Sequence, residues 1–142
     1  MASETAITAA WHALLTGDAT LNGLLAAYLG QPAVFLTDPV PEDAARPYVQ
    51  SVGTNAAPPP LDLDGKLRTY GRAITVYADA KGDPAPINAI ADRLTILLDA
   101  ANLSVAGHRT VGMTVAGPVA FSPDPESYAR TFDVTVWLFP TS

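Results

Sequence analysis

Apolar and polar residues follow a helical period near the start of the chain. Apolar side chains recur at spacings of three and four residues, at Ile7, Ala10, Trp11, Leu14 and Leu15. This spacing places side chains on one face of a helix. Ser3 precedes the run as a suitable cap and Gly17 follows it, so we expect an amphipathic helix between them.

A second helix of the same kind is expected directly afterwards. Asp18 is a suitable N-cap, and Gly30 followed by Pro32 is a suitable stop. The apolar stripe between them comprises Leu21, Leu24, Leu25, Tyr28 and Leu29. The two helices together predict an α-hairpin at the N-terminus.

The middle of the chain alternates between proline-rich segments and strands. Prolines surround a short apolar run at residues 33–36, which suits one edge strand. Tyr48–Thr54 is a second expected strand. Arg68–Asp79 is a third, and its two faces are both partly apolar.

The last part of the chain predicts one helix and two strands. Asp83 and Pro84 begin a helix that Asn102 ends, with an apolar stripe at Ile87, Ile90, Ala91, Leu94, Leu97, Leu98 and Ala101. Residues 108–116 and 128–139 follow as strands, separated by a connection that contains Pro118, Pro123 and Pro125. The order ααβ(β)βαββ predicts an α+β fold, with an antiparallel sheet of about four strands and helices packed on one face.

Composition narrows the classes of function. A length of 142 residues suggests a single domain spanning residues 1–142. The net charge of −6 argues against nucleic-acid binding through phosphate contacts. The chain has no cysteine, hence no disulfide and no thiolate ligand. With no long apolar stretch, and with Glu4 where a signal peptide would be positive, we expect neither a membrane partner nor export.

Candidate catalytic and metal-binding residues are few. The two imidazoles, His12 and His108, stand in no recognisable catalytic motif, so we expect no catalytic residue and no cofactor. Asp62, Asp64 and Gly65 match a fragment of the calcium-loop pattern. The pattern fails because the position that needs a bidentate Glu is Gly71, so we expect no metal site.

The strand faces suggest an interaction surface instead. In the last strand, Tyr128 and Arg130 share a face with the apolar Phe132, Val134, Val136 and Leu138. The opposite face carries Thr131, Asp133, Thr135, Trp137 and Phe139. We expect Tyr77, Trp137 and Phe139 to form an aromatic strip on the face away from the helices. Either this protein's own helices and loops or another subunit would cover it.

Residues 55–67 form the second candidate interaction element. Three prolines, Pro58, Pro59 and Pro60, favour an extended arm. Asp62, Asp64 and Gly65 favour a turn, after which Lys66 and Arg68 begin the return. A loop this long in a small domain is often functional, so we expect it to dock on a partner.

The order of short motifs resembles the tail terminator or tail-completion family of long-tailed phages and gene transfer agents. The motifs begin with A-x-x-A-L-L-x-x-D-A-x-L-x-x-L-L at 10–25, RPYVQ at 46–50, LDLDG at 61–65 and RAITVYA at 72–78. ADRL at 91–94, LD at 98–99 and PESYARTFDVTVW at 125–137 complete the set. The proline triplet at 58–60 departs from the family pattern.

The resemblance implies a structural virion protein assembled in the bacterial cytoplasm. Family members form hexameric rings that cap the tail tube and join it to the neck, so the partners implied are other copies, the tail tube protein and a neck or stopper protein. DNA would pass through the bore without sequence-specific binding. Another neck or minor tail component is an alternative, as is a small α+β enzyme or ligand-binding domain with a pocket between helix and sheet.

Overall fold

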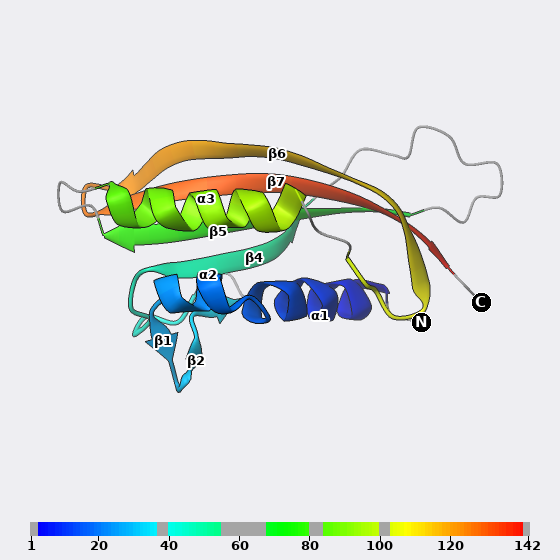
Figure 1. Ribbon diagram of the computed structural model, residues 1–142, viewed down its shortest axis with the longest axis horizontal. Helices are drawn as coiled ribbons and strands as arrows, with labels where there is room; N and C mark the ends of the chain where they lie inside the picture. The colour runs from blue at the N-terminus through cyan, green and yellow to red at the C-terminus, as the bar shows by residue number, and fades with distance from the viewer. Residues whose placement is uncertain (1–2, 37–39, 55–67, 80–83, 100–102, 141–142) are drawn as a thin grey trace.

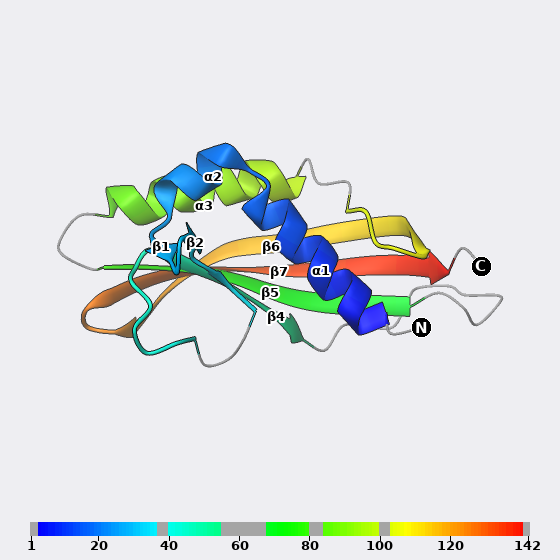
Figure 2. The same ribbon diagram turned by 90° about the horizontal axis from the view of Figure 1, so that it is seen from below.

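Helices lie on one face of a mixed five-stranded sheet in the computed structural model, which describes residues 3–36, 40–54, 68–79, 84–99 and 103–140 (Figure 1, Figure 2). The described helices are α1 (Ser3–Thr16), α2 (Ala19–Leu24) and α3 (Ala85–Asp99). The sheet contains β3 (Val34–Phe35), β4 (Tyr48–Thr54), β5 (Arg68–Asp79), β6 (His108–Asp124) and β7 (Ser127–Pro140). A separate hairpin consists of β1 (Ala27–Tyr28) and β2 (Gln31–Pro32).

The strand order in the sheet is β3-β4-β5-β7-β6. β4, β5, β7 and β6 pair antiparallel, as the sequence predicts. The short strand expected at residues 33–36 is β3, and it pairs parallel to β4. The α+β class is confirmed, but the sheet is mixed and has five strands rather than about four.

The second helix is shorter than the apolar stripe predicts. α2 ends at Leu24, and the residues expected to continue it form the β1–β2 hairpin instead. The Ala26 amide donates to the Pro47 carbonyl at 2.9 Å, and the Ala33 amide donates to the Ala26 carbonyl at 2.9 Å. These bonds satisfy backbone groups that a longer helix would pair internally, so tertiary contacts override the helical spacing.

β6 runs through the segment that was expected to be a connection. That expectation is wrong: Pro118 and Pro123 lie inside the strand, and Pro125 lies in the turn before β7. An edge strand tolerates proline because its outer side has no pairing to lose. The register against β7 shifts between Ala116 and Val119, where Gly117 adopts a φ of +112°.

The hydrophobic core lies between the helices and the inner face of the sheet. α1 contributes Trp11, α3 contributes Leu94 and β7 contributes Phe132, all fully buried. The predicted stripe of α3 is confirmed in its buried members, which are Ile87, Ile90, Ala91, Leu94 and Leu98. Burial of each such side chain stabilises the fold by about 1.5–3 kcal/mol.

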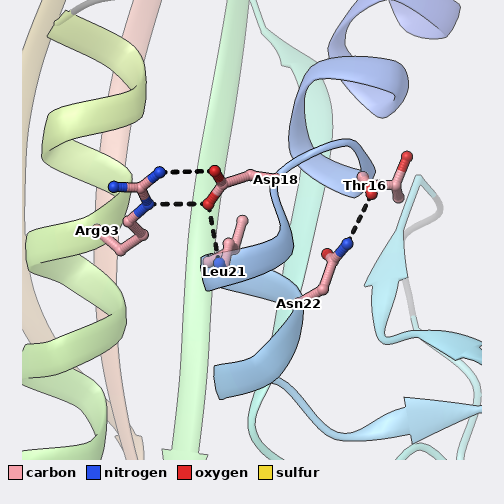
Figure 3. A network of polar contacts seen from close by, with 5 residues as sticks. All are labelled: Thr16, Asp18, Leu21, Asn22 and Arg93. Atoms are coloured by element: carbon pink, nitrogen blue, oxygen red, sulfur yellow. Dashed lines mark hydrogen bonds and ion pairs between the residues drawn. The ribbon is translucent and has the colours of Figure 1, made fainter.

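Asp18 caps α2, as predicted, and also joins it to α3 (Figure 3). The Leu21 amide donates to Asp18 Oδ2 at 2.8 Å, and Arg93 donates to both carboxylate oxygens at 2.6 and 2.8 Å. The hydrogen bond from Arg93 lowers the pKa of Asp18, and the same bond raises the pKa of Arg93. Asn22 Nδ2 donates to the Thr16 carbonyl at 2.6 Å, so α2 is fixed against both other helices.

A buried arginine connects α1 with two strands. Arg72 of β5 is 4% exposed. Its guanidinium donates to the Ser51 carbonyl of β4 at 3.3 Å and to Thr8 Oγ1 of α1 at 3.0 Å. Because a buried charge needs such hydrogen bonds, Arg72 fixes the position of α1 on the sheet.

Candidate interaction surface

One face of the sheet carries none of the described helices. Alternate β7 side chains are buried against the helices, so the residues between them point to the other face. Tyr128 and Arg130 lie on the helix side, as predicted: Tyr128 packs against the core, and Arg130 donates to Asn88 Oδ1 of α3 at 3.4 Å. Figure 2 shows the helices gathered on one side. We call the opposite side the outer face.

Aromatic side chains cross the outer face perpendicular to the strands. The register aligns Tyr48 of β4, Tyr77 of β5, Ala129 of β7 and Phe121 of β6. The ring centroids of Tyr48 and Tyr77 are 5.1 Å apart, and those of Tyr77 and Phe121 are 6.4 Å apart. The small Ala129 between them is fully buried. These separations are typical of favourable aromatic pairs.

The row continues past the β4 edge of the sheet. The Phe35 ring lies 5.5 Å from Tyr48, and the Tyr28 ring lies 5.2 Å from Phe35, both in edge-to-face contact. We call Tyr28, Phe35, Tyr48, Tyr77 and Phe121 the aromatic row. The aromatic row connects the β1–β2 hairpin on one edge with β6 on the other.

The β1–β2 hairpin ends in an exposed leucine. Tyr28 pairs with Gln31, so Leu29 and Gly30 form a two-residue loop, with φ values of 52° and 80°. Positive φ at both positions defines a type I′ turn. Leu29 is 86% exposed at this tip. The Tyr28 hydroxyl donates to Asp43 Oδ1 at 2.9 Å, which raises the pKa of Tyr28 and ties the hairpin to the segment before β4.

The three aromatic residues predicted to form a strip share the outer face but form two groups. Tyr77 belongs to the aromatic row. Trp137 pairs with Thr69, eight residues away from Tyr77 along β5, which corresponds to about 27 Å. Phe139 lies next to Trp137 in the same half of the sheet, and the Arg109 guanidinium lies 5.6 Å from its ring centroid. The sequence identified the face correctly but not the separation along the strands.

Most residues of the predicted arm cannot be compared with the structure. Arg68 starts β5 opposite Leu138 and is exposed. Pro58, Pro59, Pro60, Asp62, Asp64 and Lys66 lie outside the described residues, as does the calcium-like pattern that ends at Gly65. Their role as a docking arm therefore stays a prediction. Within the described part of the chain, no group of three or more His, Asp or Glu side chains is arranged to hold a metal ion.

The comparisons with known proteins identify the family. Residues 9–138 match the family model described as tail completion protein gp17. The chain belongs to the tail completion protein gp17 family. Its fold is similar to that of a chain in the virion of a native gene transfer agent (GTA) particle, with a TM-score of 0.71 and 23% identity over 97% of this chain and 98% of that chain. No curated protein matches the sequence.

As a member of the tail completion family, the chain is a structural tail protein and not an enzyme. His12 lines a cavity of about 350 Å³ beside the hairpin, together with Thr16 and Phe35. His108 Nδ1 lies 2.9 Å from the Ala106 carbonyl oxygen.

Among the described helices of this tail completion protein, none has the length and apolar character needed to span a membrane.

Sequence reasoning missed four members of the aromatic row. Tyr48 stands at the start of one expected strand and Tyr77 near the end of the next. Antiparallel neighbours place such positions opposite each other, so this pair was detectable. Phe121 was assigned to a connection and Tyr28 to a helix. The sequence pattern therefore gave no indication that either ring lies in a row with Tyr48 and Tyr77.

Proposed function

We propose that this member of the tail completion family is a tail terminator. Six copies assemble into a ring that caps the finished tail tube and joins it to the neck of the capsid. The partners are other copies of the chain, the tail tube protein and a neck or stopper protein. DNA passes through the bore without sequence-specific binding. Family membership over residues 9–138 is the observation that carries this proposal.

The fold supports assembly into a ring. A closed ring of identical subunits needs two unlike surfaces that fit each other, one on each side of the protomer. The sheet has two unlike edges, β3 with β4 at one side and β6 at the other. Its outer face carries exposed apolar side chains, which mark interaction surfaces in many proteins.

The charge of the protomer supports passage of DNA rather than binding. A net charge of −6 on each copy makes the whole ring acidic. An acidic bore repels the phosphate backbone and keeps DNA from adhering to the wall. Unlike a DNA-binding ring, this assembly should show no retention of duplex DNA at physiological salt.

Native mass spectrometry at several protein concentrations, with and without the tail tube protein, tests the assembly. We expect a closed hexamer, either alone or on the end of the tube. A chain that stays monomeric in both conditions would contradict the proposal. Particles lacking the gene should accumulate as unjoined heads and tails, with tails of abnormal length, and supplying the gene should restore joining.

Electron microscopy of complete particles that carry labelled protein, after their heads and tails have been separated, distinguishes a terminator from another neck or minor tail component. A terminator ring lies directly on the last ring of the tail tube. A stopper or other neck component would instead remain with the capsid when heads and tails separate. Labelled protein found on capsids and absent from tail ends would therefore favour the alternative.

A further inference from the structure

The geometry points to the surfaces that join neighbouring copies: the β1–β2 hairpin of one copy, with Leu29 at its tip, packs on Val119 and Phe121 of β6 in the next copy. This inference rests on the proposed ring and specifies its contact. The occupant is a second copy of this chain, bound head to tail.

The first observation is the position of the exposed apolar side chains. Leu29 is 86% exposed at the hairpin, whereas Val119 and Phe121 are 58% and 41% exposed on β6. The hairpin and β6 lie on opposite edges of the sheet, and the hairpin projects from the body (Figure 1). Two unlike apolar sites on opposite edges are what a head-to-tail contact between identical copies requires.

The second observation is the conformational cost at Leu29. A leucine with a φ of 52° is strained, because its Cβ crowds the backbone in the left-handed region. Asn or Gly is usual at this position of a type I′ turn. Leu29 is therefore unfavourable in the isolated protomer through both strain and exposure. A contact that buries its side chain would remove the exposure and offset the cost of the strain.

The third observation is the aromatic row, which runs from Tyr28, next to Leu29, to Phe121. Its inner members, Tyr48 and Tyr77, are half-buried, whereas Phe121 at its end is exposed. In the proposed contact, Leu29 and Tyr28 of one copy approach the exposed end of the row in the next. Packing would then continue from copy to copy around the ring.

Two single variants test the contact. Leu29→Asp and Phe121→Asp should each remain folded and fail to form rings. In a ring built from either variant alone, every contact between copies would place an aspartate against an apolar site. A mixture of the two should form a species of two chains and stop there, since one intact hairpin and one intact β6 site remain between them. Ile96→Asp is the matched control: Ile96 is 57% exposed on α3, and its variant should still form rings.

Native mass spectrometry reads these outcomes, with circular dichroism to check folding. Wild-type-like rings from both variants, while the wild type forms rings, would overturn the contact and leave the proposed ring intact. A folded mixture that stays monomeric would overturn it as well. A wild type that never forms a ring, alone or with the tail tube, would overturn the proposed function and the contact together.

Cysteine cross-linking gives a readout that does not require loss of assembly. The chain has no cysteine, so introduced cysteines have no competing thiol. Oxidation of a Leu29→Cys, Val119→Cys double variant should give a ladder of covalent oligomers that reducing agent removes. The control double variant, Leu29→Cys with Ile96→Cys, should give no ladder. Equal ladders from both, or a ladder from the control alone, would contradict the inferred contact.

Discussion

Asp18 and Arg93 join two helices through both oxygens of one carboxylate. Asp18 Oδ2 accepts hydrogen bonds from Arg93 Nε and from the Leu21 amide, both at 2.8 Å. Asp18 Oδ1 accepts a hydrogen bond from Arg93 Nη2. The same side chain thus caps α2 and connects it to α3. Loss of the carboxylate removes a local and a long-range contact at once.

Substitution of Asp18 separates these two roles. Asp18→Ala should lower the free energy of unfolding by about 1–2 kcal/mol, mainly through loss of the cap. Asp18→Asn keeps a capping oxygen, and its cost should be smaller, because a partly exposed ion pair contributes less than about 1 kcal/mol. Urea denaturation at pH 7 measures both. Equal costs for the two variants would contradict a capping role.

The pH dependence follows from the lowered pKa of Asp18. The folded protein holds the carboxylate in its charged form, so the contribution is present above the unfolded pKa of about 3.9. It is lost as the pH falls through the lower folded pKa. The stability difference between wild type and Asp18→Asn should therefore shrink below about pH 4. A difference that is unchanged down to pH 2 would show that the ion pair contributes nothing.

Two glycines should respond to alanine with opposite signs. At Gly117 an added Cβ would lie 2.7 Å from the Thr131 carbonyl oxygen, and the φ of +112° disfavours any side chain. We expect Gly117→Ala to destabilise the fold by about 2–3 kcal/mol. Gly23 in α2 has open space around it, so Gly23→Ala should stabilise by about 0.5–1 kcal/mol. Thermal unfolding of both variants checks this contrast.

Trp137 and Phe121 both lie on the outer face, but we expect different effects. The Trp137 indole packs against Gly112, and its Nε1 is buried. Trp137→Ala should therefore destabilise the monomer itself, by about 3 kcal/mol. Phe121 is much more exposed, so Phe121→Ala should change monomer stability by less than about 1 kcal/mol and weaken assembly. Chemical denaturation and native mass spectrometry on both variants distinguish the two roles.

Leu29→Asn should raise the stability of the isolated protomer and weaken its assembly into rings. Asn-Gly is the preferred sequence of a type I′ turn, so relief of strain should stabilise the monomer by up to about 1 kcal/mol. Rings should form poorly because the apolar tip is gone. A variant that is both less stable and fully able to assemble would contradict the interpretation of this turn.

Replacement of both histidines should leave particle assembly intact. His12 and His108 lie far apart in sequence, and a structural tail protein needs neither for catalysis. His12→Ala with His108→Ala should restore infectious or transducing particles when supplied to a gene-deficient strain. Loss of particles by a folded double variant that still assembles would point to a chemical role for these side chains.

The sequence predicted the elements whose local pattern agrees with their surroundings. Tyr48–Thr54 and Arg68–Asp79 appear with the expected bounds, and Asp18 caps α2 as its side chain favours. The prediction failed where contacts with residues distant in sequence determine the local structure. The stripe through Leu29 fits a helix by spacing, yet the Pro47 carbonyl takes the Ala26 amide and ends the helical run.

The interaction surface was predictable by face but not by position. Alternation along a strand places Tyr77 and Trp137 on the same side without knowledge of the fold. How far apart they lie depends on which residues of β5 and β7 pair, and that register is set by the whole sheet. Phe121 belongs to the aromatic row because β6 is an edge strand and continues through the prolines around Phe121.

The interrupted register of β6 bears on how free subunits behave before assembly. Regular pairing with β7 covers 108–110, 112–116 and 119–121, with shifts between these runs. Amyloid-like stacking draws on regular segments of six or seven residues, and none of these runs is that long. A 17-residue edge strand would otherwise be a template for uncontrolled growth. The interruptions therefore allow a long edge to remain open to a partner while limiting fibre formation in the unassembled pool.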